Sequence, residues 1–324
     1  MKATAGTAGD LVPILQRELA RTSPELAPIA CISRRPSMYR SSFPLDELDV
    51  ELSDGTVLPM VLKDASAPLP EARDAKPRFV RESRREVRVY RSGILGSGLA
   101  PACHGAVADR AWLFLERVAG TPLSQSGDLD AWREAARALA RLHGRFAQGP
   151  PHLPELLRRD ARFYRRWPRR AVRLLRRGSA DARSVFGLLR VAARYDVVVE
   201  RLLAAPQTFV HGEPYPSNVL LLPETGRTGV RLVDWEMAGT GPGPLDLAAL
   251  VSGRWPEADR AEIVAAYTEA APPRLVAGLP SLLDAGRLHL AMQWLGWSST
   301  WTPPPDQAHD WTAEALDAAE RLGL

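Results

Sequence analysis

Short apolar stretches separated by turn residues fill the first 120 positions, a pattern typical of a small β-sheet. Asp-Gly at 54–55 separates two of these stretches and favours an antiparallel pair of strands. The predicted strands cover 29–33, 45–52, 57–62, 94–99 and 111–115. Apolar residues at helical spacing predict helices over 10–21 and 78–91. An antiparallel sheet with few helices is therefore expected here.

Beyond residue 120 the apolar positions recur mostly every three or four residues, which predicts a helical region. The predicted helices cover 129–146, 155–177, 184–203, 259–270 and 280–298. A chain of 324 residues is long enough to build two substantial cores. The expected fold class is therefore α+β, with a sheet in the first part and mostly helices in the second.

One segment of the second part departs from the helical pattern. Strand-like residues at 209–210 lead into a polar loop that Asn218 closes, and two apolar runs, 219–222 and 230–233, follow around the turn PETGRTG. This predicts a hairpin that brings Glu213, Asn218 and Asp234 close together. Phosphoryl transfer needs such groups: a carboxylate orients or deprotonates the acceptor hydroxyl, and an Asn and an Asp hold metal against nucleotide phosphates.

The motifs of this segment resemble those of the aminoglycoside phosphotransferase-like family of small-molecule kinases. The loop HGEPYPSN is similar to the family's HGDxxxxN, the strand ending in Asp234 continues as D-W-E, and GPGPLDLA follows over 241–248. The resemblance implies a protein-kinase-like, two-lobed fold. Residues 1–118 would form the nucleotide-binding N-lobe, and 119–324 would form the C-lobe with the catalytic loop and the acceptor site.

The resemblance also implies an activity, namely transfer of the γ-phosphate of ATP or GTP, with Mg²⁺, to a hydroxyl of a small molecule such as an antibiotic, a sugar or another natural product. Glu213 would be the catalytic carboxylate, and Asn218 and Asp234 would act in catalysis as the metal ligands. Lys63, at the end of a predicted strand, would hold the nucleotide phosphates. Glu86 would position Lys63, because the family pattern E-x-x-x-Y selects it over Glu82.

Further nucleotide contacts are expected in two other stretches of the N-lobe. The polar stretch RRPSMYRSS stands where the family has the loop that covers the phosphates, but it contains no glycine. Either its side chains contact the phosphates, or the stretch is an exposed basic turn. The side chains that could make such contacts are Arg34, Arg35, Ser37 and Arg40. The stretch 117–120 resembles the hinge between the lobes. There the backbone of Glu116 and Val118 would bind the adenine.

Glu213 stands where the family has Asp, one methylene shorter, and a shift of about 1 Å can cost about a hundredfold in rate. The alternative to a kinase is therefore a nucleotide-binding pseudokinase with a regulatory or binding role; a different transfer reaction at the same site is a third reading. Two other polar residues are expected to have structural roles: His211 would shape the loop HGEPYPSN, and Asp246 would brace it. His143 is expected to be packed or capping, and Glu236 to assist either the metal or the turn.

The amino-acid composition limits the kinds of acceptor and partner that the protein is expected to bind. The net charge is +4, and the only lysines are Lys2, Lys63 and Lys76, so nearly all basic residues are arginine. The arginine-rich stretch 155–177 favours an acceptor that is not a cation, and its few aromatic residues argue against a nucleic-acid partner. Four tryptophans could line the acceptor pocket or belong to the core, namely Trp294, Trp297, Trp301 and Trp311.

Other features of the sequence argue against a disulfide, a zinc site, a membrane span and a signal peptide. Cys31 and Cys103 lie far apart without a CxxC motif and are expected to be buried thiols, neither a disulfide nor a zinc site. No apolar run approaches the roughly 20 residues that span a bilayer. The first residues, MKATAGTAGD, lack an apolar signal core. A cytoplasmic protein is expected, and the sequence leaves its oligomeric state open.

Overall fold

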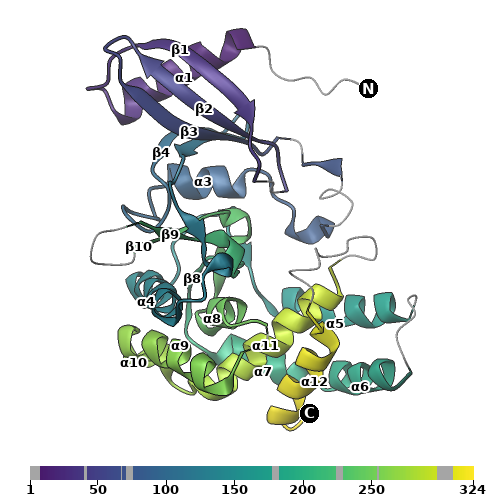
Figure 1. Ribbon diagram of the computed structural model, residues 1–324. Helices are drawn as coiled ribbons and strands as arrows, with labels where there is room; N and C mark the ends of the chain where they lie inside the picture. Colours follow the sequence, from purple (N-terminus) through teal and green to yellow (C-terminus); the bar gives the residue numbers. More distant parts are fainter. Residues whose placement is uncertain are drawn as a thin grey trace. The chain divides into compact units, whose positions relative to one another are not determined.

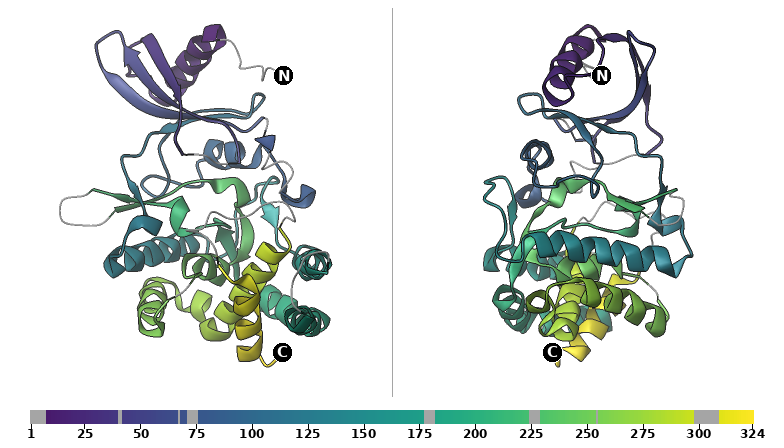
Figure 2. Two further views of the ribbon diagram at one scale, coloured as in Figure 1. Left: turned by 45° about the vertical axis from the view of Figure 1, so that its right-hand side comes forward. Right: turned by 90° about the vertical axis from the view of Figure 1, so that its left-hand side faces the viewer.

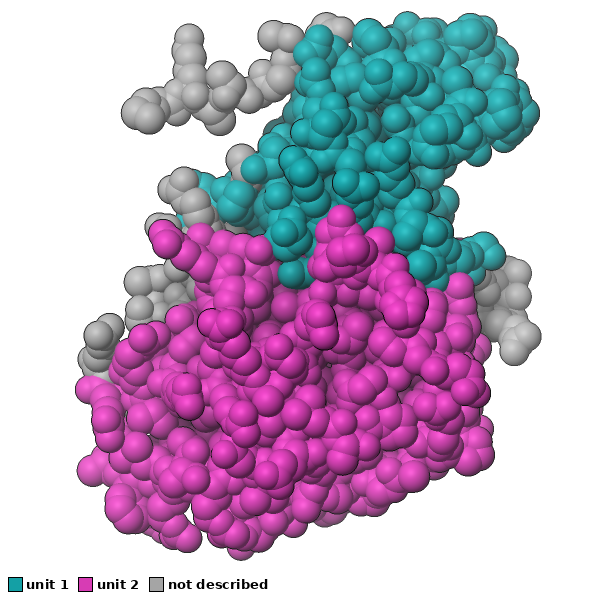
Figure 3. Space-filling view, turned by 180° about the vertical axis from the view of Figure 1, so that it is seen from behind, with its two compact units in different colours: residues 1–73, 82–119 teal, residues 74–81, 120–324 magenta. Residues whose placement is uncertain are grey.

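The structure, a computed structural model, describes residues 8–39, 42–66, 68–70, 76–176, 182–223, 229–253, 255–297 and 309–324. The chain forms two compact units, which Figure 3 shows in different colours. Unit 1 comprises Met1–Arg73 and Glu82–Ala119, and unit 2 comprises Asp74–Arg81 and Gly120–Leu324. The short segment 74–81 thus belongs to unit 2, although it precedes a helix of unit 1, and residues 76–81 of it are described.

Unit 1 is built on a five-stranded sheet in the order β1-β2-β3-β5-β4, with every neighbouring pair antiparallel (Figure 1). Its strands are β1 (Ile29–Pro36), β2 (Leu45–Leu52), β3 (Val57–Asp64), β4 (Cys103–Val107) and β5 (Trp112–Glu116). The Asp-Gly turn between β2 and β3 gives Gly55 a φ of 86°, which glycine adopts without strain. The predicted five-stranded antiparallel sheet is confirmed.

Two helices accompany this sheet, α1 (Ala8–Thr22) and α3 (Arg85–Arg91). Helix α1 lies beside the sheet (Figure 2). Its apolar face, with Leu15 and Leu19 almost fully buried, packs with Leu48, Met60 and Phe114 of the sheet into one hydrophobic core. This amphipathic pattern is the reason why a helix forms at the start of the chain.

Unit 2 is mostly helical. Its helices are α4 (Leu129–Arg145), α5 (Ala161–Leu175), α6 (Ala182–Ala193), α7 (Asp196–Ala204), α8 (Pro244–Leu250), α9 (Glu257–Ala270), α10 (Pro273–Val276), α11 (Leu279–Leu295) and α12 (Trp311–Arg321). Helix α11 is apolar around most of its circumference and packs against α5, α7, α8 and α12 (Figure 1). Side-chain caps start three of the helices: Asp128, Asp160 and Asp310 each accept a backbone N–H of the first turn.

Two small sheets carry the loops of unit 2. One has the order β10-β9-β6 and the other β7-β11-β8. Their strands are β6 (Thr121–Pro122), β7 (Leu157–Arg158), β8 (Gln207–Val210), β9 (Val219–Leu222), β10 (Gly229–Leu232) and β11 (Gly239–Pro242). Strands β9 and β10 pair antiparallel from Val219↔Leu232 to Leu222↔Gly229, which is the predicted hairpin. The interior of its turn, 224–228, lies outside the described residues.

Four predicted elements differ from the structure. The helix expected over 155–177 begins only at Ala161, where α5 starts after the short strand β7. The helix expected over 78–91 is a 3-10 turn at Arg78–Val80 followed by α3, which begins only at Arg85. The strand expected over 94–99 was wrong, because Gly93, Gly96 and Gly98 adopt positive φ in a series of turns and the strand forms instead at β4. The helix expected over 184–203 is divided into α6 and α7.

The structure also bears on the expectations about the two cysteines and about membrane-spanning helices. Cys31 is exposed on the edge strand β1, so its predicted burial was wrong, and Cys103 is partly buried; both thiols are free. None of the helices among the described residues is long and apolar enough to cross a membrane.

Candidate active site

The loop between β8 and β9 holds Glu213 and Asn218 in a fixed arrangement. The side-chain Nδ2 of Asn218 donates to the carbonyl oxygen of Glu213 at 2.9 Å, and the Asn218 amide donates to the carbonyl of Tyr215 at 2.7 Å. The amide of Val233 donates to the Asn218 carbonyl at 2.9 Å, which ties the loop to the end of β10. The hairpin therefore brings the predicted catalytic carboxylate and both predicted metal ligands to one place.

Glu213 lies among several charges of unit 2. Burial raises the pKa of its carboxyl to about 7; the positive charges of Lys76 and Arg159 oppose this rise, and the negative charges of Glu236 and Asp234 add to it. The carboxyl thus belongs to a cluster of acidic groups held beside two buried cations.

Asp246, at the start of α8, holds the loop between β8 and β9 through its carboxylate. Its two carboxylate oxygens accept the backbone N–H groups of His211 at 2.7 Å and Gly212 at 2.8 Å, and one of them also contacts Nε2 of His143 at 3.1 Å. Burial alone would raise the pKa of Asp246, but the hydrogen bond from His143 and the nearby charges outweigh it and hold the pKa below its ordinary value. The bracing role expected for Asp246 is confirmed.

The two histidines near Asp246 are structural, as expected. His143 is fully buried and its Nδ1 contacts the hydroxyl of Tyr267 at 2.8 Å. His211 is also buried; its Nε2 contacts the Val233 carbonyl at 3.0 Å and its Nδ1 accepts the amide of Glu213 at 3.3 Å. His211 therefore joins the catalytic loop to the end of β10 through both ring nitrogens.

Arg159, directly before α5, was missed by sequence reasoning. Its guanidinium is buried and donates to the carbonyl of Met237 at 2.9 Å. A Cβ on Gly212 or Gly239 would overlap this guanidinium, and Gly212 also has a φ of 94°. Glycine is required at both positions because the guanidinium of Arg159 occupies the space that a Cβ would need. These two glycines are therefore the feature of the sequence that could have indicated a buried side chain here.

Asp234 follows β10 in an unusual backbone conformation. Its φ of 65° and ψ of 66° are left-handed, which few residues other than glycine, asparagine and aspartate adopt. The next residue, Trp235, is fully buried, stacks on Phe209 with 5.8 Å between ring centroids, and donates from Nε1 to the Leu232 carbonyl at 3.0 Å. The indole anchors the turn that places Asp234 at the end of the strand.

Lys76 is the second cation that the sequence did not assign to the site. It is only 7% exposed and pairs with Glu236, which is 5% exposed. Its Nζ also lies 6.0 Å from the centroid of the Trp297 ring. The third residue of the D-W-E motif is therefore neutralised by a lysine from the segment 74–81.

Unit 1 holds the one ion pair that was predicted from the sequence. Nζ of Lys63, on β3, lies 2.6 Å from Oε2 of Glu86 on α3, and both side chains are at most 4% exposed. Lys63 also lies 5.7 Å from the centroid of the Phe43 ring. Glu82, the rejected alternative, is exposed and accepts the amide of Arg84 at 3.1 Å. The predicted choice of Glu86 as the partner of Lys63 is confirmed.

The side chains expected to cover the phosphates are engaged with the sheet. Arg34 pairs with Asp46 at 2.6 Å, and Arg35 pairs with Glu47 at 2.7 Å and with Asp49 at 2.8 Å. These pairs arise because β1 extends to Pro36, so both arginines belong to a strand and not to a loop. The structure thus favours the reading of an exposed basic stretch for these two residues.

The other nucleotide contacts expected in unit 1 stay predictions. The hydroxyl of Ser37 contacts Glu47 at 3.3 Å and accepts the amide of Tyr39 at 3.2 Å, whereas Arg40 lies outside the described residues. The amide of Glu116 donates to the Ala102 carbonyl at 2.8 Å, so an adenine contact would fall to its carbonyl oxygen. Val118 is half-buried in the stretch after β5.

Aromatic residues of unit 2 extend from the catalytic loop. Tyr215 lies 5.4 Å from Trp294, which stacks on Trp311 at 5.3 Å. Trp297 stacks on Trp167 at 5.7 Å. Trp294 and Trp297 therefore connect the helical core to the neighbourhood of Glu213, while Trp301 lies outside the described residues.

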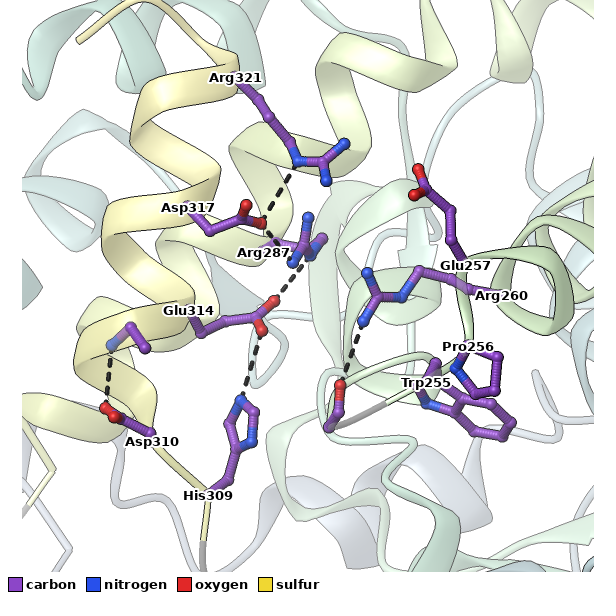
Figure 4. A pocket seen from close by; sticks show the side chains of 12 residues that line it. Trp255, Pro256, Glu257, Arg260, Arg287, His309, Asp310, Glu314, Asp317 and Arg321 are labelled. Atoms are coloured by element: carbon purple, nitrogen blue, oxygen red, sulfur yellow. Dashed lines mark hydrogen bonds and ion pairs between the residues drawn. The ribbon is translucent and has the colours of Figure 1, made fainter.

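A cavity of about 590 Å³ lies elsewhere in unit 2, between α9, α11 and α12 (Figure 4). Its charged side chains mostly pair with one another: Arg287 contacts Glu314 at 2.7 Å and Asp317 at 3.1 Å, and Glu314 also contacts His309 at 3.4 Å. Arg287 and His309 lower the pKa of Glu314 to about 2, although burial opposes this. None of the predicted site residues lines this cavity, so it is not the candidate active site.

The predicted metal ligands fit magnesium. Carboxylate and amide oxygens are hard donors, and Mg²⁺ is commonly held by one or two protein ligands together with substrate phosphates. The Glu213 carbonyl fixes the orientation of the Asn218 amide, so Oδ1 is the end that can bind a cation. Among the described residues, no group of three or more His, Cys, Asp or Glu is placed to hold a metal alone, so the phosphates would have to complete the coordination.

Comparison with known proteins agrees with this geometry. Residues 46–284 match the model of the phosphotransferase enzyme family, and the chain belongs to that family. A search of curated protein sequences finds no match. The structure resembles a microcompartment-associated aminopropanol kinase, with a TM-score of 0.60, 16% identity, and coverage of 93% of this chain and 94% of that one.

Two further solved structures have the same fold. An ethanolamine kinase of Plasmodium vivax gives a TM-score of 0.55 at 13% identity, over 89% of this chain and 82% of that one. The choline kinase LicA of Streptococcus pneumoniae gives 0.53 at 12% identity, over 97% and 99%. The predicted protein-kinase-like fold, with an antiparallel sheet followed by a mostly helical part, is confirmed.

Proposed function

We propose that the protein is a small-molecule kinase that transfers the γ-phosphate of ATP or GTP to a hydroxyl group of a small molecule. The observation that carries the proposal is the β9–β10 hairpin, in which Asn218 is bonded to Glu213 and tied to the end of the strand that precedes Asp234. Family membership and the fold of the similar kinases support it. The proposal includes a cytoplasmic location, because it requires a nucleoside triphosphate as substrate.

Each group has a defined task in this proposal. Lys63, held by Glu86, binds nucleotide phosphates, and Asn218 and Asp234 hold Mg²⁺. When bound, Mg²⁺ supplies charge neutralisation at the phosphates. Glu213 orients the acceptor hydroxyl and takes its proton as the acceptor oxygen bonds to the γ-phosphorus; the bond from this phosphorus to the bridging oxygen breaks, and the nucleoside diphosphate leaves.

The acceptor is a small hydroxyl compound, such as a natural product or a sugar. The similar structures are kinases of aminopropanol, ethanolamine and choline by name, which supports a small alcohol as the class. Their low identity, 12–16%, shows a common fold and leaves the acceptor of this chain to experiment.

The first test is Mg²⁺-dependent binding of ATP and of GTP by calorimetry. Wild type is compared with Asp234→Ala and with Asp130→Ala, an exposed aspartate of α4 that serves as control. The proposal expects binding that requires Mg²⁺, is lost in Asp234→Ala and is unchanged in Asp130→Ala. Absence of binding by both nucleotides would contradict it.

A second candidate, a nucleotide-binding pseudokinase, is favoured by one observation, the longer side chain of Glu213 in place of the family's Asp. Glu213→Asp separates the two in an acceptor screen with mass detection of the product. A rise in turnover, with a mass gain of one phosphate, supports a kinase slowed by the extra methylene. Nucleotide binding without turnover of any acceptor, in wild type and variant alike, supports the pseudokinase, and a different mass gain would reveal another transfer.

A further inference from the structure

The segment that carries Lys76 is fixed to unit 2 by specific contacts. Within the segment, Nε of Arg81 donates to the Lys76 carbonyl at 2.7 Å and so fixes the backbone at Lys76. Val80 is fully buried in the helical core, and the ring of Phe79 packs edge-on against Trp167 with 5.0 Å between centroids. Lys76 therefore does not sample the surface; its position is determined by the core of unit 2.

Its ammonium occupies an environment that suits a bound cation. The carboxylate of Glu236 pairs with it, and the indole of Trp297 lies 6.0 Å away. That indole is itself held by stacking on Trp167 at 5.7 Å and 7°. A carboxylate combined with an aromatic face is an arrangement that recognises ammonium groups, because both present negative potential to the cation. Here the protein's own side chain is the cation.

This environment adjoins the catalytic carboxylate. The charge of Lys76 acts on Glu213 strongly enough to oppose the effect of burial on that carboxyl. Tyr215, two residues after Glu213, contacts Trp294, whose ring lies 6.5 Å from that of Trp297. An acceptor bound at Glu213 would therefore come close to the charge of Lys76 and to this chain of aromatic rings.

We infer that Lys76 is a specificity-determining residue of the acceptor site, which fills the cation position against Glu236 and Trp297 and so selects acceptors without a positive charge. A cationic acceptor would meet a like charge in a poorly solvated place and would find both cation-binding groups already taken. A neutral or anionic acceptor meets no such repulsion. This inference rests on the proposed function, because it concerns the acceptor of that same site.

The test uses tetramethylammonium as a probe of the cation position. Its affinity for the full-length wild type, Lys76→Ala and Lys76→Arg is measured by tryptophan fluorescence and by thermal shift against equal concentrations of NaCl. Removal of the lysine is expected to raise the affinity for tetramethylammonium at least about tenfold, while the charged variant Lys76→Arg stays close to wild type. Equal affinity in wild type and Lys76→Ala overturns the inference.

A second measurement needs no variant and so remains decisive if Lys76→Ala does not fold. Choline and 3,3-dimethylbutan-1-ol have the same shape and differ only in charge. Wild type is expected to bind and phosphorylate the neutral alcohol in preference to choline, and a preference for choline overturns the inference. Binding of Mg²⁺ and ATP is measured on the same samples; its loss would count against the proposed function, while the tetramethylammonium affinities still judge Lys76 separately.

Discussion

The side-chain amide of Asn218 donates a hydrogen bond to the backbone carbonyl of Glu213, with 2.9 Å between the two atoms. This bond closes the loop that carries the predicted catalytic carboxylate, and it leaves the amide oxygen of Asn218 as the end of the side chain that can bind a cation. One residue thus couples the position of the expected base to the expected metal site.

Two substitutions at Asn218 should separate these two roles. Asn218→Ala removes both the loop hydrogen bond and the oxygen ligand, whereas Asn218→Asp keeps oxygen ligands but loses the N–H donor. Both are expected to lower kcat about a hundredfold, because the carboxylate of Glu213 is displaced. Only Asn218→Ala should also raise the Mg²⁺ concentration needed for half-maximal nucleotide binding. Ser217→Ala, an exposed neighbour, is the control, and an equal rise in both Asn218 variants would disprove the separation.

The buried pair of Lys63 and Glu86 leads to a prediction about stability. Lys63→Met removes the cation that pairs with the Glu86 carboxylate at a site that is 3% exposed, and breaking such a buried ion pair costs about 3–5 kcal/mol. The double variant Lys63→Met with Glu86→Leu removes the uncompensated charge and should recover most of this free energy of unfolding, yet it should not restore nucleotide binding. Urea denaturation and calorimetry measure the two quantities. If the double variant is no more stable than the single one, the pair is not what Lys63→Met disrupts.

Gly212 should tolerate no side chain. Its φ of 94° is strained for alanine, and a Cβ would overlap the Met237 carbonyl and the guanidinium of Arg159. Gly212→Ala is therefore expected to lower the free energy of unfolding by about 2 kcal/mol or more and to reduce kcat/KM about a hundredfold through displacement of the adjacent Glu213. Gly127→Ala has open space around its Cβ and serves as the matched control. Similar losses in the two variants would show that close approach at Gly212 is not the cause.

The parts of the fold that were predicted correctly from the sequence are those that short stretches of sequence determine. Strands β2 and β3 were predicted because an Asp-Gly turn lies between alternating apolar residues, and the pairing of Lys63 with Glu86 followed from family spacing. The catalytic hairpin was predicted because Glu213, Asn218 and Asp234 stand at the ends of apolar runs. Each of these features is encoded within one short segment or one motif.

The features that were missed depend on contacts between distant segments. Lys76 reaches Glu236 across 160 positions of sequence, and Arg159 is buried under glycines at 212 and 239. The residues next to Lys76 and Arg159 in the sequence do not mark either side chain as buried; Lys76 stands out only as one of three lysines, and the glycines that mark Arg159 lie far along the chain. The strand expected over 94–99 failed for a local reason, since apolar content was counted there without the turn preference of Gly93, Gly96 and Gly98.

His289, on α11, should make the stability of the protein depend on pH. Burial, and then the charge of Arg159, lower the pKa of its imidazole to about 3, and its Nδ1 contacts the hydroxyl of Tyr195 at 2.8 Å. In the unfolded chain the imidazole takes up a proton below pH about 6.5, whereas in the folded protein it does so only near pH 3. Its contribution to stability is therefore complete above pH 6.5 and is lost as the pH falls, by up to about 1.4 kcal/mol for each pH unit.

Urea denaturation at pH 7, 6 and 5 measures this loss in wild type and in His289→Asn, whose amide can still bond Tyr195 but does not titrate. The variant is expected to lose less stability between pH 7 and 5 than wild type, by about 1.5–2 kcal/mol. Other groups, such as His211, whose pKa burial also lowers, contribute equally to both proteins and cancel in the comparison. Equal slopes in wild type and His289→Asn would mean that His289 is not the group that titrates.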